Sequence, residues 1–347
     1  MKSVNEWPLL DKEKLFGYLR GNSYLSERHK LLYVATPKVA CTSLKWWFAD
    51  LEGCAQAIRQ SGGSGESNPE LAIHDTFHKV APNVTGLTPD ALLEPLTSEA
   101  YFRFAVVRNP YKRIFSAWQS KLLLREPLQI APYLQYDFFN LPIKSMADVS
   151  VAFEGFLEHL AAHEAPDYWD AHWTPQATLL RPDLVNYSKV VQIENVKELS
   201  AALAEWLGPQ FIDPFATRSA NESLIPYLPE LITARSAELI RLLYAEDFAK
   251  FGYSTQPPTA NESFSTDQFN LAVKAIEILR GRHQRLSEMG AQITSLNQAV
   301  TQRDCVISEL NKQIALLSDV RDQIYNSLSW KITKPLRYLS RTLFSKG

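Results

Sequence analysis

The chain has 347 residues, of which 46% are hydrophobic and 21% are charged, and its formal net charge is −2. This length allows one α/β core of roughly 250 residues with an appendage. The balanced charge argues against nucleic acid as a partner, so any anion site must be local. The three cysteines are too few and too scattered for a disulfide framework or a C-x-x-C zinc pair, and they favour a reducing compartment.

Residues 1–30 are expected to form a polar, helical lead-in. The first fifteen residues lack the apolar core of a signal peptide. Nowhere does the chain reach the roughly 18 consecutive apolar residues of a membrane span. From these features we expect a cytoplasmic protein.

The next stretch is predicted to be a strand, a loop and a helix. Leu31–Ala35 is a short apolar run that suits a strand buried on both faces. A helix is expected over Leu44–Leu51, with Thr42 or Ser43 at its N-cap. The intervening Pro-Lys-Val-Ala-Cys-Thr-Ser offers Lys38, small residues and two hydroxyls at a helix N-terminus, which favours an anion. It lacks the glycines of a Walker A loop, and an ordinary turn with a surface lysine is the alternative.

Two histidines follow a loop-like segment, residues 61–70. His74 and His78 are four residues apart, so on a helix they would share one face. Histidine titrates in the range that proton transfer requires. The alternative is a pair of polar loop histidines or a histidine with a packing role. No third ligand stands at a spacing that would suit a metal.

A second strand–turn–helix unit is predicted further on. Tyr101–Val107 has the pattern of a strand, and Tyr111–Leu124 that of a helix with proline in its first turn. Arg108 follows the strand directly, and Ser116 lies about a turn and a half into the helix. A guanidinium fork with a hydroxyl suits a dianionic phosphate.

Together, Pro-Lys-Val-Ala-Cys-Thr-Ser and Val-Val-Arg-Asn-Pro-Tyr-Lys-Arg-Ile-Phe-Ser-Ala-Trp resemble the two phosphosulfate-binding motifs of the sulfotransferases. The similarity is strongest to the carbohydrate sulfotransferases and spans about Leu31–Tyr253. It implies a P-loop-like parallel sheet flanked by helices. It also implies 3′-phosphoadenosine 5′-phosphosulfate (PAPS) as the sulfuryl donor, without a metal.

The resemblance also implies roles for individual residues. Lys38 would be catalytic, and His74 or His78 would be the base, with His74 the first choice. Arg108 and Ser116 would hold the 3′-phosphate. The 5′-phosphosulfate would be held by Lys38, Val39, Ala40, Cys41, Thr42 and Ser43.

A later segment resembles a family segment that contains His-Trp-x-Pro. By this likeness, the residues near the acceptor groove would be Trp169, His172, Trp173 and Gln176. Aromatic faces and amide edges suit sugar rings. A packed aromatic loop is the alternative. Apolar spacing further predicts helices over Asp148–His163 and Ala234–Lys250, and a strand over Ser188–Ile193.

The C-terminal third has a heptad pattern. After the Pro257-Pro258 boundary, apolar residues alternate at spacings of three and four through residues 259–328, interrupted by Arg303 and Arg321. This pattern predicts a coiled coil, and therefore a homo-oligomer, with a long helix folded back on the core as the rival. The predicted domains are thus 1–256, 259–328 and 329–347. The seam comprises Leu286, Met289, Ile293, Leu296, Val300, Ile307, Leu310, Ile314, Leu317, Ile324 and Leu328.

The final segment, residues 329–347, is basic and amphipathic. It suits an anionic membrane surface, which would place the protein on the inner face of the plasma membrane. It also resembles the Ser-Trp-(Lys/Arg)-x-Thr-x-Pro-Leu-Arg tail of bacterial cell-surface glycosyltransferases. A solvated helix end is the alternative. The basic residues are Lys331, Lys334, Arg337, Arg341 and Lys346, and the apolar stripe is Ile332, Leu336, Leu339 and Leu343.

The function expected from these features is sulfuryl transfer from PAPS to a hydroxyl of a carbohydrate, such as a bacterial cell-surface glycan. Two other classes of protein stay open. A P-loop-like small-molecule kinase would need a carboxylate–magnesium site after a strand. A coiled-coil scaffold with a degenerate nucleotide fold would need no intact anion loop.

Overall fold

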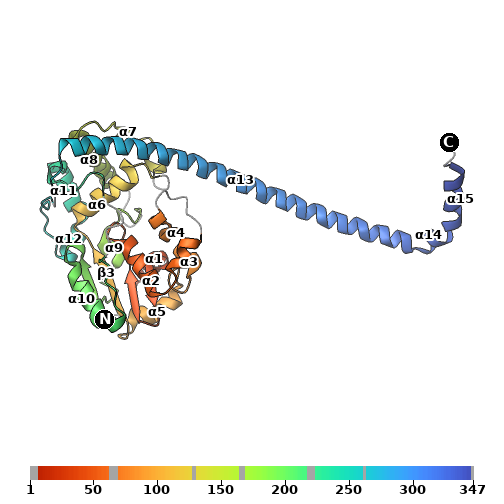
Figure 1. Cartoon of the computed structure of the whole chain (residues 1–347), viewed down its shortest axis with the longest axis horizontal. Coiled ribbons are helices and arrows are strands. Elements are labelled where there is room, and N and C mark those ends of the chain that lie inside the picture. The colour runs from red at the N-terminus through yellow and green to blue at the C-terminus, as the bar shows by residue number, and fades with distance from the viewer. Residues whose placement is uncertain are drawn as a thin grey trace. The chain divides into compact units, whose positions relative to one another are not determined.

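The computed structural model describes residues 7–61, 69–126, 130–163, 169–216, 223–260 and 263–344. The chain divides into two compact units, Met1–Leu286 and Ser287–Gly347. The first unit contains the sheet and both anion-binding motifs (Figure 1). The second unit contains the later part of the longest helix and the basic tail.

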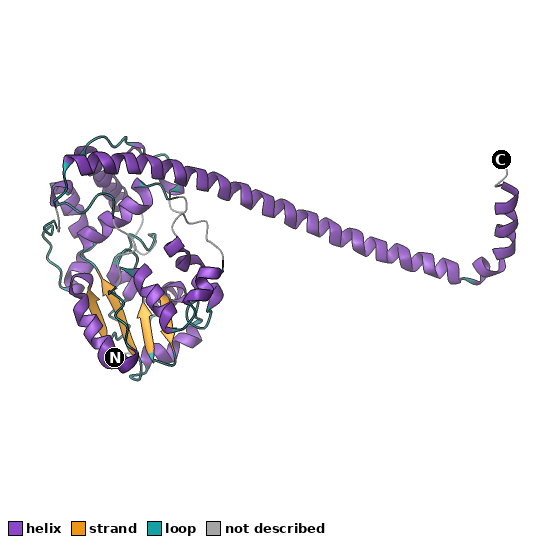
Figure 2. Ribbon diagram, viewed as in Figure 1, coloured by secondary structure: helices purple, strands orange, loops and turns teal. Residues whose placement is uncertain are grey.

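The sheet has four strands in the order β1-β2-β3-β4, drawn in orange in Figure 2. Strands β2, β3 and β4 are parallel, as predicted, and β1 adds an antiparallel edge strand beside β2 that the prediction did not include. The strand β1 was missed because its four residues, Ser-Tyr-Leu-Ser, have no strand signal of their own. The strands are β1 (Ser23–Ser26), β2 (Leu31–Val34), β3 (Phe102–Val107) and β4 (Lys189–Gln192).

Helices cover both faces of this sheet. Because side chains alternate along a strand, Tyr33 and Phe104 point to one face, where their rings stack at 5.0 Å between centroids. That face packs against α2 (Cys41–Leu51), α4 (Ile73–Val80) and α10 (Val196–Leu207). Leu32 and Ala105 point to the other face and pack against α1 (Leu9–Asn22) and α5 (Pro89–Thr97). Burial on both faces explains the nearly continuous apolar run of β2 and β3.

A third apolar cluster joins the helices that follow β3 to those near the end of the first unit. The helix predicted over Asp148–His163 is confirmed as α8, which a capping box between Ser145 and Asp148 starts. The helix predicted over Ala234–Lys250 is broken at Tyr244. The remaining elements are α3 (Ala55–Gln60), η2 (Pro69–Ala72), α6 (Pro110–Trp118), the π-helix η3 (Gln119–Leu123), η4 (Ala131–Tyr133), α7 (Asp137–Asn140), α8 (Met146–Ala162), α9 (Gln176–Leu180), η6 (Ile193–Asn195), η7 (Gly208–Gln210), η8 (Pro229–Leu231), α11 (Ala234–Leu243) and α12 (Ala245–Phe251).

The longest helix, α13 (Thr266–Asn326), begins on the core of the first unit. Phe269 and Ile276 are buried there. Further along, the Arg280 guanidinium and the His283 ring donate to the carbonyls of Leu123 and Leu124, at the end of η3. The first turns of α13 therefore do pack on the core, as the rival interpretation proposed. In the second unit the heptad seam is exposed, so coiled-coil pairing stays a prediction.

The tail forms two helices, α14 (Leu328–Ile332) and α15 (Lys334–Phe344). The guanidinium of Arg337 lies 3.7 Å from the ring centroid of Trp330, which holds the two helices together at the bend. Across the described ranges, the structure contains no helix with the length and apolar character that crossing a bilayer requires. Lys346 lies outside the described residues.

Candidate active site

The loop between β2 and α2 has an unusual backbone. Lys38 and Ala40 both have positive φ, 69° and 50°, a region that residues other than glycine rarely adopt. Ala40 is the N-cap, so the prediction that Thr42 or Ser43 caps the helix is wrong, and both lie in its first turn. Among the described residues, no side chain caps α2. A helix end of this kind presents its first backbone N–H groups to an anion.

The ends of β2 and β3 bring the two predicted anion sites together. The two strands are parallel neighbours, with Val34 opposite Ala105, so their carboxyl ends lie side by side. Arg108, which follows β3, donates from Nη1 to the backbone carbonyl of Lys38 at 3.2 Å. The predicted meeting of the two motifs at neighbouring strand ends is confirmed.

Three cations gather at this junction, from Lys38, Lys45 and Arg108. In the described parts of the chain none of them forms an ion pair with a carboxylate. Burial, followed by the charge of Lys121, lowers the pKa of Lys38 to about 8. Burial also lowers the pKa of Arg108. Two buried cations on contacting segments, Lys38 and Arg108, form no ion pair with a carboxylate in the described parts of the chain, and such an arrangement indicates a site for an anionic ligand.

Arg113 ties the anion loop to the segment before α9. Its guanidinium is buried and donates to the carbonyls of Pro37, Thr174 and Ala171 at 3.1, 2.8 and 2.9 Å. These donors of Arg113 therefore hold backbone. Its neighbour on α6, Ser116, is half-buried, and its assignment to the 3′-phosphate stays a prediction.

Gln176 holds the other side of Arg108. Its amide donates to the Arg108 carbonyl and accepts from the Arg108 N–H, both at 2.9 Å. The amide also donates to the buried carboxylate of Asp247. Gln176 is fully buried, so these bonds make it a support for the backbone of Arg108, and its expected contact with an acceptor stays a prediction.

His74, on α4, lies against the first turns of α2. The Lys45 ammonium, which can only donate, lies 2.8 Å from Nδ1, so Nδ1 accepts. The remaining proton is then on Nε2, which donates to Thr42 Oγ1 at 3.1 Å. His74 is exposed at the surface, yet desolvation by the surrounding protein, followed by the charge of Lys45, lowers its pKa to about 2. His78, one turn later, is exposed.

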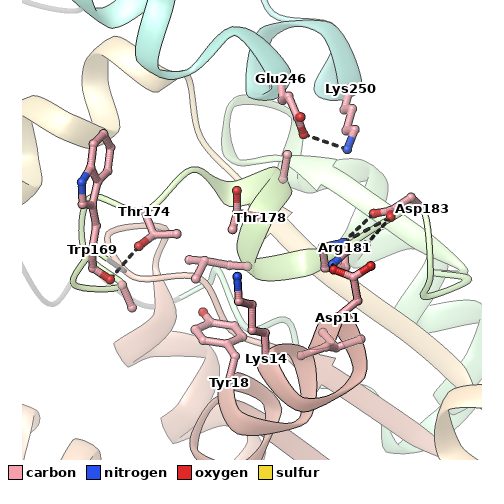
Figure 3. Close-up of a pocket in the computed structure, with 14 residues that line it drawn as sticks. Asp11, Lys14, Tyr18, Trp169, Thr174, Thr178, Arg181, Asp183, Glu246 and Lys250 are labelled. Atoms are coloured by element: carbon pink, nitrogen blue, oxygen red, sulfur yellow. Dashed lines mark hydrogen bonds and ion pairs between the residues drawn. The ribbon is translucent and has the colours of Figure 1, made fainter. Parts of the chain in front are cut away.

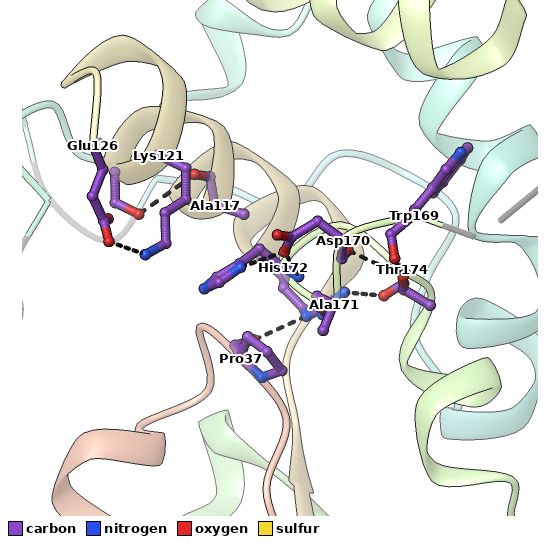
Figure 4. Close-up of polar contacts among 11 residues, drawn as sticks. Pro37, Ala117, Lys121, Glu126, Trp169, Asp170, Ala171, His172 and Thr174 are labelled. Atoms are coloured by element: carbon purple, nitrogen blue, oxygen red, sulfur yellow. Dashed lines mark hydrogen bonds and ion pairs between the residues drawn. The ribbon is translucent and has the colours of Figure 1, made fainter. Parts of the chain in front are cut away.

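The predicted acceptor residues occupy different environments. Trp169 and Trp173 are 8% and 2% exposed and pack in the core. His172 is half-buried, and its Nδ1 donates to Asp170 Oδ1 at 2.5 Å. Figure 4 shows the His172 ring pointing away from this segment, toward the space between Lys121 and Pro37. Of these three side chains, His172 lies beside the anion loop, while the two tryptophans are part of the buried core.

A cavity of about 370 Å³ lies beside this segment, between α1, residues 169–183 and α12 (Figure 3). Its charged groups neutralise one another. Arg181 forms ion pairs with Asp11 and Asp183, and Lys250 pairs with Glu246. This balance contrasts with the uncompensated cations of the anion loop, so the cavity is a poor candidate for the phosphosulfate. Within the described ranges, no cluster of three or more His, Cys, Asp or Glu side chains could hold a metal ion.

Comparison with known proteins assigns the family. The profile described as "Sulfotransferase family" matches residues 22–254, well over half of the chain. The chain therefore belongs to the sulfotransferase family. Its match covers both anion motifs, the segment before α9 and all four strands.

Among curated relatives, the chain is 26% identical over 250 residues to carbohydrate sulfotransferase 10 of Danio rerio, and 25% identical over 250 residues to that of Homo sapiens. Each alignment covers 66% of this chain and 66% of the relative. Carbohydrate sulfotransferase 14 of Mus musculus is 26% identical over 243 residues, which is 66% of this chain and 59% of the relative. No solved structure is significantly similar to the chain.

Proposed function

We propose that this protein transfers the sulfuryl group of PAPS to a hydroxyl of a carbohydrate. One observation carries the proposal: the Arg108 side chain contacts the Lys38 backbone, at an uncapped helix end with three cations that lack carboxylate partners. A nucleotide with phosphates at two ends would satisfy both groups at once. The names of the curated relatives, which are carbohydrate sulfotransferases, support the carbohydrate as acceptor.

The residues present fit such a donor. The positive φ of Lys38 and Ala40 turns the loop backbone toward the start of α2, where its N–H groups and the hydroxyls of Thr42 and Ser43 would surround the 5′-phosphosulfate. Val39, Ala40 and Cys41 supply backbone to the same cradle. Arg108 and Ser116 would hold the 3′-phosphate and so fix the register of the nucleotide.

PAPS supplies an activated sulfuryl group, whose transfer passes through a loose, in-line transition state like that of phosphoryl transfer. Lys38 would neutralise the charge that grows on the leaving 5′-phosphate oxygen as the sulfur–oxygen bond lengthens. A histidine would accept the proton of the attacking hydroxyl, and the sequence predicts His74 or His78. Both ring nitrogens of His74 are engaged by α2, which argues against it in this arrangement.

For the acceptor we propose a bacterial cell-surface glycan, on the strength of the tail's resemblance to those of bacterial glycosyltransferases. The acceptor would approach past the segment that contains Trp169, His172, Trp173 and Gln176. The basic face of α14 and α15 would hold the enzyme on the anionic inner face of the plasma membrane, where lipid-linked glycans are assembled. Binding of the purified chain to vesicles with and without anionic lipid tests this location.

We also propose that the heptad seam pairs with a second copy of this chain, in parallel. Four of the seven a positions carry β-branched residues and three of the six d positions carry leucine, which favours two parallel strands. In this register Arg303, at d, would lie beside Asp304 of the partner chain, at e. The a positions are Leu286, Ile293, Val300, Ile307, Ile314, Arg321 and Leu328, and the d positions are Met289, Leu296, Arg303, Leu310, Leu317 and Ile324.

The test of function is transfer of label from PAPS, labelled in its sulfuryl group, to a panel of polysaccharides. Desulfated chondroitin, desulfated heparin and purified bacterial capsular polysaccharides are suitable acceptors. Label should enter at least one polysaccharide, and Lys38→Ala should abolish its incorporation. Binding of the nucleotide without transfer to any acceptor would contradict the proposed function.

A further inference from the structure

His172 and Asp170 form a pair whose geometry suits proton abstraction. Asp170 accepts from both the backbone N–H of His172, at 2.8 Å, and its ring Nδ1, at 2.5 Å. The two bonds fix the orientation of the ring and place its proton on Nδ1. The opposite nitrogen, Nε2, then carries a lone pair, which is the arrangement that a carboxylate imposes on a catalytic histidine.

The position of the pair relative to the anion loop is fixed by buried contacts. Arg113 bonds the carbonyl of Ala171, which precedes His172, and also the carbonyl of Pro37, which precedes Lys38. The Thr174 hydroxyl donates to the carbonyls of Trp169 and Asp170 and closes the turn. In Figure 4 the ring of His172 extends from this turn toward Lys121 and Pro37. The turn is therefore held rigidly against the loop that would bind the phosphosulfate.

The electrostatic surroundings of His172 come from several elements. Burial lowers its pKa, Asp170 opposes that effect, and Lys121 on η3 and Lys38 on the loop add to it. The ring of His74, on α4, also faces the group. A histidine in such surroundings is neutral, and a bound polyanion would compensate the cations and increase its basicity.

We propose that His172 is the general base of sulfuryl transfer and that Asp170 is its positioning residue. This inference rests on the proposed function. As the acceptor oxygen forms its bond to sulfur, its proton moves to Nε2 of His172. The sulfur–oxygen bond to the 5′-phosphate breaks, and the electron pair stays on the phosphate oxygen next to Lys38. Atoms and charge balance without a metal or a further reactant.

The experiment compares His172→Gln, His74→Gln and His78→Gln with the control His163→Gln, on the acceptor that wild type sulfates in the panel. His163 is exposed at the end of α8, and its ring bonds the carbonyl of His159 on the same helix. Loss of a general base lowers kcat by about 10²–10⁴-fold. We expect this loss in His172→Gln and wild-type kcat in His163→Gln, with an unchanged Kd for adenosine 3′,5′-bisphosphate that shows the His172 variant is folded. A comparable loss in His74→Gln or His78→Gln with none in His172→Gln would assign the base to that residue instead.

Two further measurements distinguish a catalytic role of His172 from a purely structural one. Imidazole should restore turnover to His172→Ala, because a freely diffusing base can fill the space the ring leaves. Asp170→Asn should lower the plateau of the pH–rate profile and move its acidic limb to lower pH, because the carboxylate raises the pKa of His172. Wild-type turnover in His172→Gln would overturn this inference and leave the proposed function standing. Absence of transfer by wild type would overturn both.

Discussion

Because the pKa of Lys38 is lowered, we expect the Kd of the nucleotide to depend on pH between pH 7 and pH 9.5. With a pKa of about 8, roughly nine in ten Lys38 side chains are charged at pH 7 and roughly one in ten at pH 9. A bound polyanion needs the charged form and raises this pKa. The Kd for adenosine 3′,5′-bisphosphate should therefore be constant below pH 8 and weaken about tenfold for each pH unit above it. The phosphates themselves are fully ionised in this range.

Isothermal titration calorimetry between pH 7 and pH 9.5 measures this dependence directly. Lys38→Arg is the matched control, because a guanidinium stays charged throughout. The variant should lose the weakening above pH 8, whatever its affinity at pH 7. A Kd for wild type that is constant up to pH 9.5 would refute the reasoning, since Lys38 would then either keep its ordinary pKa or not contact the nucleotide.

Three other predictions follow from named contacts. Arg113→Met removes the charged donor from three carbonyls, one buried and two part-buried, so the free energy of unfolding in urea should fall by about 3–6 kcal/mol, while the exposed Arg20→Met leaves it unchanged. Arg108→Ala should raise the Kd for adenosine 3′,5′-bisphosphate about 10- to 100-fold and affect kcat less, and equal affinity would remove Arg108 from the site. Leu310→Asp, in the heptad seam, should give a monomer in analytical ultracentrifugation, whereas Leu316→Asp, which is also exposed but lies outside the seam, should stay dimeric; a monomeric wild type would contradict the pairing.

The junction of the two motifs could be predicted from sequence because its signals are local. Leu31–Ala35 is an apolar run that a short turn joins to Lys38. Tyr101–Val107 is a second such run, and Arg108 follows it directly. Parallel strands place such ends at one edge of a sheet, so two short motifs were enough to define the site. The heptad repeat of α13 could also be recognised from the sequence, because it extends over many turns.

The supporting contacts could not be predicted because they join residues far apart in the chain. Nothing in the sequence near Arg113 indicates that its guanidinium binds carbonyls some sixty and seventy residues away. The same holds for Gln176, whose amide is matched to the backbone of Arg108. Asp170 stood two residues from His172, and that spacing was the one available signal for a carboxylate–histidine pair.

Local conformation accounts for the other differences. The sequence placed the N-cap at a hydroxyl residue, following the usual preference, but the backbone reverses earlier, at Ala40 with its positive φ. Such strained backbone is typical of ligand-binding loops, where the bound group rather than a side chain satisfies the helix end. The strand β1 exists only because β2 offers it an edge, and pairing of this kind has no local signature.

The central claim is that the ends of β2 and β3 bind one nucleotide with phosphates at two positions. Thermal denaturation of the purified chain with adenosine 3′,5′-bisphosphate, or with ATP and magnesium, tests it most directly. The account predicts a higher Tm with adenosine 3′,5′-bisphosphate alone, and no such increase in the double variant Lys38→Ala/Arg108→Ala. A Tm that rises only with ATP and magnesium, or with neither nucleotide, would contradict it.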